Sequence, residues 1–227
     1  MRTYLDPTAP IAPDAILVDD PKGAMDLAVA VCESPRMSNL AHGLWGYHGT
    51  TSEGQELTIQ ALGIGGPSAF CVVSDLGRLG VRRAIRIGSC ISLDRVFELG
   101  SVIVAAPIEA SEGLGAALSA SPAGEPDEEL TRGLLRASGA RATVPVRSVY
   151  VYPERPKAQG GEAAIDLSTA AVVAAGAAAA IACASALIVA ESPGRGPLDK
   201  DALDEALRGL GKRAGAALGA APQASGL

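Results

Sequence analysis

An arginine inside an apolar run is the clearest candidate for chemistry in this sequence. Arg86 stands in Ala84-Ile85-Arg86-Ile87, where a positive charge is costly unless it meets an opposite charge. Ser89, just past the run, could add a hydroxyl donor. The two residues together indicate an anion-binding site. A salt bridge from Arg86 to an acid such as Asp94 is the alternative that these residues leave open.

Two further segments have the composition of ligand-binding turns. They are Asp19-Asp20-Pro21-Lys22-Gly23 and Gly63-Ile64-Gly65-Gly66-Pro67-Ser68. Glycines allow backbone amides to come close to a ligand, and open α/β folds bind ligands where strands end and loops turn into helices. The second segment is no Walker motif, because no Gly-Lys-Ser/Thr follows it.

The elements that would position these segments alternate along the chain. Short apolar runs predict strands at 15–18, 44–48, 56–62, 84–87, 101–106, 144–152 and 186–190. Helical spacing is found at 22–32, from the glycine-rich segment through Leu79, and at 126–138 and 199–218. Residues 111–125 have the composition of a long surface loop. This alternation predicts an α/β fold with a central sheet in a single domain over 1–220, followed by a flexible tail at 221–227.

One segment imitates a membrane span. Thr169 to Ala190 contains 22 residues without a charge, but alanine, glycine and serine dominate it and these insert weakly into lipid. We therefore expect a buried helix followed by a buried strand, and no membrane partner.

Composition excludes several classes of protein. The chain has 227 residues, of which 48% are hydrophobic and 19% charged, so a packed core is expected and disorder is not. The net charge of −6 argues against nucleic acid as a partner, because phosphate neutralisation needs a basic surface. The cysteines are scattered without a CxxC pair, which predicts reduced thiols and no zinc site: Cys32, Cys71, Cys90 and Cys183. The N-terminal segment lacks the apolar core of a signal peptide, so a cytoplasmic location is expected.

Several motifs resemble the nucleoside phosphorylase family, of the uridine phosphorylase and hexameric purine nucleoside phosphorylase type. The central match runs from Leu62-Gly63-Ile64-Gly65-Gly66-Pro67-Ser68 through Leu79-Gly80-Val81 to Ile85-Arg86-Ile87-Gly88-Ser89-Cys90. Weaker matches extend it over roughly residues 15 to 215: Val18-Asp19-Asp20-Pro21 to a Gly-Asp-Pro turn, 43–50 to the following hairpin, 98–104 to a strand, 148–153 to a Ser-Asp-Thr-Phe-Tyr-Pro stretch, and 165–170 to a Glu-Met-Glu motif.

The resemblance implies a fold and a reaction. The fold is a twisted mixed central β-sheet flanked by helices, in dimers or trimers of dimers that share active sites. The reaction is attack of phosphate on C1′ of a nucleoside, through an oxocarbenium-like transition state, to give free base and pentose 1-phosphate. Phosphate is a co-substrate, and the resemblance implies no other cofactor and no metal.

The phosphate positions of the family are only partly kept. Arg86 matches the principal phosphate arginine, and Ser89 the phosphate-binding hydroxyl. His42 takes the place of the arginine lent by a neighbouring subunit. Gly23 replaces another arginine, which the adjacent Lys22 could substitute, and Asp19 replaces the turn glycine, adding a negative charge to the site.

The sugar and base positions have also changed. By the same resemblance, Ser168 replaces the glutamate that grips the ribose hydroxyls, with Asp166 and Leu167 before it, and Tyr4 lies near the position of an N-terminal histidine. Cys90 would line the sugar and base pocket. Tyr152 is retained beside the base, while Val151 replaces a stacking phenylalanine. Glu191 falls near the aspartate that protonates the leaving base, with Ser192 and Arg195 as alternatives.

Ordinary structural roles remain open for some of these residues. Asp19 could cap the helix that begins near Pro21, and Asp166 could cap the alanine-rich helix. Three functions follow: a phosphorolytic pentosyltransferase, a hydrolytic nucleosidase that needs no phosphate pocket, or a family member that binds another small molecule without catalysis.

Overall fold

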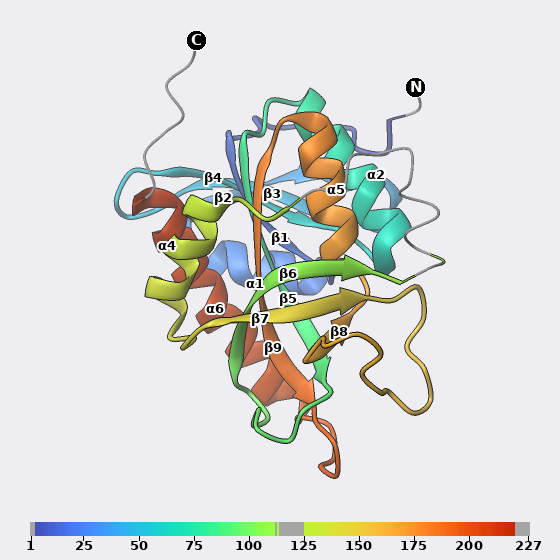
Figure 1. Ribbon diagram of the computed structural model, residues 1–227. Coiled ribbons are helices and arrows are strands. Elements are labelled where there is room, and N and C mark those ends of the chain that lie inside the picture. Colours follow the sequence, from blue (N-terminus) through green and yellow to red (C-terminus); the bar gives the residue numbers. More distant parts are fainter. Residues whose placement is uncertain (1–2, 112, 114–124, 221–227) are drawn as a thin grey trace.

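The computed structural model describes residues 3–111, 113 and 125–220, and its centre is a mixed β-sheet (Figure 1). Nine strands are connected in the order β2-β3-β4-β1-β5-β8-β7-β6-β9, and β9 also pairs with β5. Because β9 contacts both β5 and β6, five of the strands close into a ring. The strands are β1 (Asp14–Val18), β2 (Glu33–Asn39), β3 (Gly46–Thr50), β4 (Glu56–Ala61), β5 (Arg83–Ser92), β6 (Val102–Ala110), β7 (Thr143–Ser148), β8 (Ala164–Asp166) and β9 (Ala182–Glu191).

Strands β4, β1, β5 and β9 run parallel and form the buried middle of the sheet. Their carboxyl ends therefore meet at one edge, where ligands gather in folds of this kind. The register of β1 against β5 pairs Leu17 with Arg86. This register places Asp19, two residues beyond Leu17, next to Gly88 on the neighbouring strand.

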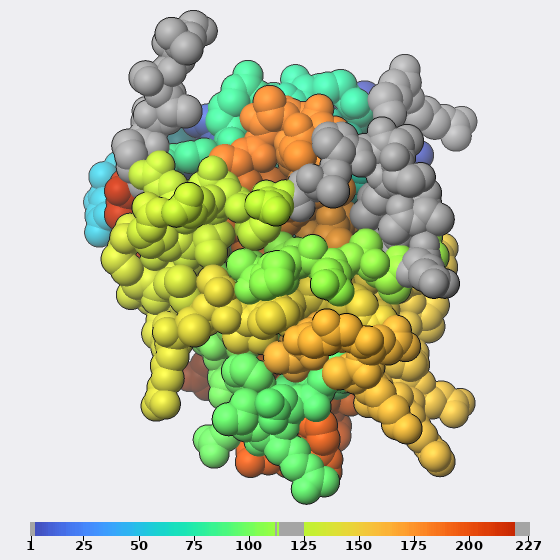
Figure 2. Space-filling view, viewed as in Figure 1, coloured from blue at the N-terminus to red at the C-terminus, as the bar shows by residue number. Residues whose placement is uncertain are grey.

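Helices cover both faces of the sheet. They are α1 (Pro21–Val31), α2 (Gly65–Arg78), α4 (Glu128–Ser138), α5 (Thr169–Ala179) and α6 (Lys200–Ala220), with a short 3-10 helix η1 (Ala41–Gly43). Helices α2 and α5 pack together on one face, and α1, α4 and α6 lie on the other, each group over its own hydrophobic cluster. Figure 2 shows strands β6, β7 and β8 lying across one side of the molecule, below α5.

Most predicted elements are confirmed, including the helix and strand in the uncharged segment 169–190. Among the described residues, no helix has the length and apolar character needed to cross a membrane. The described residues also contain no cluster of metal-ligating side chains, and all four cysteines are free thiols. Most of the predicted loop 111–125, and the predicted tail 221–227, lie outside the described residues.

Two predictions about elements were wrong, and two strands were missed. Strand β5 does not end at Ile87 but continues to Ser92, since it pairs with β9 along most of its length. The glycine-rich segment is not all loop, because α2 already begins at Gly65. The polar β2 and the three-residue β8 were not predicted, since neither has an apolar run long enough to stand out.

Candidate active site

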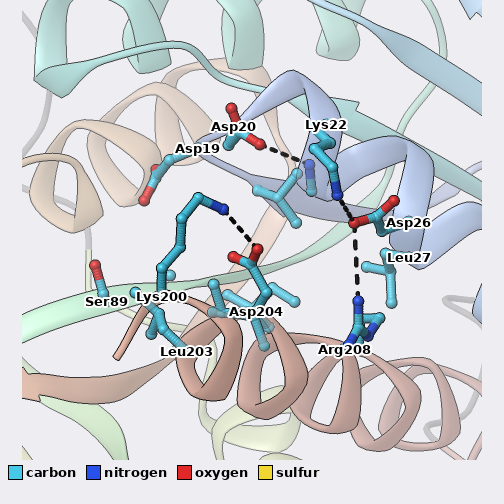
Figure 3. A pocket seen from close by; sticks show the side chains of 15 residues that line it. Asp19, Asp20, Lys22, Asp26, Leu27, Ser89, Lys200, Leu203, Asp204 and Arg208 are labelled. Atoms are coloured by element: carbon cyan, nitrogen blue, oxygen red, sulfur yellow. Dashed lines mark hydrogen bonds and ion pairs between the residues drawn. The ribbon is translucent and has the colours of Figure 1, made fainter. Parts of the chain in front are cut away.

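A cavity of about 400 Å³ opens at the carboxyl ends of β1 and β5, between α1 and α6. Figure 3 shows that charged side chains from both helices and from the β1–α1 turn point into it. The size suits a small polar ligand. Its lining consists of Val18, Asp19, Asp20, Lys22, Gly23, Asp26, Leu27, Ile87, Gly88, Ser89, Lys200, Leu203, Asp204, Leu207 and Arg208.

The first turn of α1 forms one wall of the cavity. Asp20 caps this helix, since its Oδ2 accepts a hydrogen bond of 2.8 Å from the backbone N–H of Gly23. Pro21 follows in the first turn, where its missing N–H costs nothing. The suggestion that Asp19 caps the helix was therefore wrong by one residue, and the Asp19 carboxylate is left for another contact.

The Asp19 carboxylate contacts Arg86. Its Nη2 donates to both carboxylate oxygens of Asp19, at 2.9 and 3.1 Å. On the other side, Nη1 lies 3.0 Å from Oδ2 of Asp166 and donates to Oγ1 of Thr169. The predicted alternative partner Asp94 was wrong; its carboxylate accepts from the backbone of Val96 instead.

The burial of this ion-pair group is uneven. The side chains of Arg86 and Asp166 are 1% and 0% exposed, while that of Asp19 is 36% exposed and lines the cavity. Arg86 Nε has no hydrogen-bond partner within the described part of the chain. Arg86 therefore lies outside the lining of the cavity and contacts Asp19, which belongs to that lining.

The Asp166 carboxylate accepts several hydrogen bonds from neighbouring protein groups. It accepts hydrogen bonds from the hydroxyl of Ser148 at 2.5 Å, from the hydroxyl of Thr169 at 2.6 Å, and from the backbone N–H groups of Ser168 and Thr169. The last two N–H groups are at the start of α5, but the N-cap residue of this helix is Ser168, so the alternative that Asp166 is the cap of the alanine-rich helix was wrong by two residues. This carboxylate fixes α5 and Arg86 relative to each other.

Ser89 lies on the other side of its strand from Arg86. Side chains alternate along β5, and its pairing with β9 is regular from Arg83 to Cys90. Ser89 therefore faces the cavity with Ile87, whereas Arg86 and Gly88 face the opposite side. A Cβ atom added at Gly88 would lie 2.7 Å from Nη2 of Arg86 and 2.8 Å from Oδ2 of Asp19.

The charged groups of Asp19, Arg86 and Asp166 shift one another's pKa values. Burial raises the pKa of the Asp19 carboxyl group; the Arg86 guanidinium opposes that shift and Asp166 adds to it. Burial disfavours the charged form of Arg86, but the two carboxylates outweigh it and hold its pKa above the ordinary value. Burial also raises the pKa of Cys90, which favours its thiol over its thiolate form.

The other predicted site residues fall into separate places. Tyr4 and His42 contact each other edge to face, with ring centroids 5.9 Å apart, on the exposed surface. Glu191 is exposed at the end of β9, where it pairs with Ile91 of β5. The remaining ones are the buried Cys90 and Ser168, the half-buried Leu167 and Tyr152, which is 36% exposed. None of these lines the cavity, so the structure brings together Asp19, Lys22 and Ser89 there, with Arg86 and Asp166 behind.

Helix α6 supplies cavity residues that the sequence analysis missed. Lys200, Asp204 and Arg208 recur every four residues, which places them on one face of a helix. That spacing was the available signal. Lys200 pairs with Asp204 at 2.7 Å, and Asp26 of α1 pairs with both Lys22 and Arg208. Each cation in the lining is thus held by a carboxylate.

Several proteins to which this chain is similar in sequence or structure are nucleoside phosphorylases. No protein-family profile matches the chain. Over 96 residues it is 32% identical to the purine nucleoside phosphorylase DeoD-type of Oceanobacillus iheyensis. The matched segment covers 42% of this chain and 40% of that protein. Over 61 residues it is 41% identical to the guanosine phosphorylase of Halorubrum lacusprofundi, covering 27% and 25% of the two chains. These matches thus span less than half the length of the curated relatives.

The structural comparison covers almost the whole chain. The purine nucleoside phosphorylase of Toxoplasma gondii, solved in complex with immucillin-H, superposes with a TM-score of 0.79. The match covers 92% of both chains at 22% sequence identity. The predicted resemblance and the predicted fold, a mixed sheet flanked by helices, are confirmed.

Proposed function

We propose that this chain, which has the nucleoside phosphorylase fold, is a pentosyltransferase that cleaves the N-glycosidic bond of a nucleoside with phosphate. The products would be a free base and pentose 1-phosphate. One observation carries the proposal: the cavity at the carboxyl ends of β1 and β5 adjoins Ser89 and the first turn of α1, with Arg86 one side chain behind. The named relatives make purine nucleosides the substrates to test first.

The proposed roles follow from position. A helix N-terminus such as that of α1 favours an anion, because it is the positive end of the helix dipole. Ser89 would donate its hydroxyl to phosphate, and Lys22 and Lys200 would add positive charge from opposite walls. Phosphate oriented in this way would attack C1′ while positive charge develops on the sugar.

The residues proposed for sugar and base binding lie apart from the cavity. Cys90, Tyr152, Leu167 and Ser168 follow the family positions but lie outside the lining of the cavity. Glu191 is exposed, so it would need a bound nucleoside or a second subunit beside it to act as the acid. Tyr4 and His42 form a surface pair that suits a site shared between copies of this chain. We therefore also propose a cytoplasmic homo-oligomer that needs no cofactor besides phosphate.

The experiment is a panel of purine and pyrimidine nucleosides, assayed with and without inorganic phosphate by chromatography of the products. Pentose 1-phosphate formed only with phosphate, and lost in Ser89→Ala and Arg86→Gln variants, is the expected result. Base released equally well without phosphate would contradict phosphorolysis. Absence of cleavage of every nucleoside would contradict the proposed enzyme.

A hydrolytic nucleosidase is the second candidate, and a specific contact favours it. The Asp19 carboxylate accepts hydrogen bonds from the Arg86 guanidinium, at the position where phosphate oxygens would bind. Water needs no such guanidinium, so an occupied Arg86 is compatible with hydrolysis. Free pentose as product, in place of the 1-phosphate, would identify this activity.

A further inference from the structure

Asp19 presents to Arg86 what a bound anion would present. Both of its oxygens accept from Nη2, at 2.9 and 3.1 Å, in charge-assisted hydrogen bonds of the kind that a carboxylate or a phosphate forms with a guanidinium. Asp166 already balances the single charge of Arg86 from the other side. The group of three therefore has one negative charge in excess when Asp19 is ionised.

Asp19 is the exchangeable member of the group. Asp166 is fully buried and holds α5 through backbone and hydroxyl hydrogen bonds. Asp19, by contrast, belongs to a turn, is partly exposed and does no capping, because Asp20 caps α1. Its carboxylate can leave Arg86 without breaking an element of the fold.

The backbone of β5 at Gly88 leaves room for the contact between Asp19 and Arg86. Gly88 stands where the register of β1 and β5 directs Asp19, and any Cβ there would collide with both members of the ion pair. The pair thus depends on a glycine in the middle of a regular strand. No other role for the missing side chain is needed to explain that position.

We propose that the Asp19 carboxylate is a tethered competitor of phosphate, which occupies the anion position of Arg86 and must turn away before inorganic phosphate can bind. The inference rests on the proposed function in taking Arg86 as the anion-binding residue. Asp19 and phosphate cannot both occupy the Nη2 side of the guanidinium, since like charges so close repel strongly. Asp19 therefore sets the phosphate affinity of the site and with it the choice between phosphate and water as nucleophile.

The test is calorimetric titration of inorganic phosphate into the wild-type chain and into an Asp19→Asn variant. The amide keeps the size of the side chain and removes its charge. Asp20→Asn is the matched control: it removes the same charge from the lining of the same cavity, asparagine still caps α1, and Asp20 does not contact Arg86. A double variant, Asp19→Asn with Arg86→Gln, shows whether any gain depends on the guanidinium.

We expect Asp19→Asn to bind phosphate at least about tenfold more tightly than wild type, as one charge-assisted contact warrants. Asp20→Asn should change the affinity much less, and the double variant should lose the gain. Equal affinities in wild type and Asp19→Asn would overturn the inference, as would an equal gain in Asp20→Asn. Asp19→Ser, which is smaller and also uncharged, is the second variant should the amide disturb folding, and the same results are expected of it.

The inference and the proposed function fail in different ways. A variant that binds phosphate more tightly but cleaves no nucleoside supports the competition and contradicts the pentosyltransferase. A wild-type enzyme that forms pentose 1-phosphate efficiently, with Asp19→Asn no better at low phosphate, supports the proposed function and contradicts the competition.

Discussion

The guanidinium of Arg86 and the carboxylate of Asp166 form an ion pair of 3.0 Å inside the protein, with 1% and 0% of the two side chains exposed. Such a pair is held by hydrogen bonds on both partners, here from Ser148 and Thr169 to Asp166. Removing the Asp166 charge leaves Arg86 with the partly exposed Asp19 as its remaining counter-ion and weakens the buried hydrogen bonds that Asp166 accepts, which costs more than loss of a surface pair.

Asp166→Asn should therefore destabilise the fold by about 3 kcal/mol, measured as the free energy of unfolding in urea. The control is Arg132→Gln, which breaks the exposed pair with Glu128 on α4 and should cost less than about 1 kcal/mol. Similar losses in the two variants would show that the Asp166 carboxylate is not needed to neutralise Arg86.

Gly88→Ala should destabilise the fold by about 1–3 kcal/mol, because the new Cβ would meet Arg86 and Asp19. Gly196→Ala is the control, since its Cβ would meet nothing within 4 Å and its backbone needs no positive φ. In an Asp19→Ser background the cost at Gly88 should shrink, since one of the two colliding side chains is shortened. Strict additivity of the two changes would contradict that contact.

Anion affinity at Arg86 should depend on pH through Asp19. Above the raised pKa of Asp19 its carboxylate holds Arg86, and below it the neutral acid releases the guanidinium. Affinity for sulfate, whose own charge stays constant as Asp19 titrates, should therefore rise as the pH falls through the raised pKa of Asp19. Phosphate is avoided as the probe because it titrates here.

The control for this pH dependence is Asp19→Asn, whose sulfate affinity should change much less over the same range. It keeps the other charged groups near position 19, so a remaining slope measures their effect: Asp20, Lys22, Asp26, Arg86, Tyr152, Asp166, Lys200, Asp204 and Arg208. An equal slope in wild type and variant would assign the titration to one of those groups.

Lys200→Ala tests the contribution of α6 to the cavity. If Lys200 adds positive charge to the site, the variant should raise the KM for phosphate about two- to fivefold, and the effect should fade with added salt. Lys212→Ala is the control, since Lys212 is exposed on the same helix and does not line the cavity. A KM unchanged by Lys200→Ala, or raised as much by Lys212→Ala, would remove α6 from the site.

The sequence predicted that Arg86 needs a negative partner but not which one. Burial of a charge follows from an apolar strand, a local pattern. The partners Asp19 and Asp166 are 67 and 80 residues away, and only the pairing of β1, β5 and β8 brings them together. Asp94 was chosen because it is near in sequence, and sheet register carries no local signal.

The length of β5 has a similar explanation. Gly88 and Ser89 indicate a strand end when they are considered alone, since glycine weakens strands. In the structure their neighbour β9 continues past them, and its hydrogen bonds keep Gly88 extended. This continuation puts Ser89 and Arg86 on opposite faces, which the motif alone did not indicate.

Asp19 stands in a turn, whereas Arg86 is inside a strand and Asp166 ends one. The costly part of an anion site, a buried cation with its counter-ion, is thus built into the rigid framework. If Asp19 competes with phosphate as proposed, the part that decides whether a free anion can enter is a single loop position. A substitution there would change the anion affinity of the site while the scaffold stays the same.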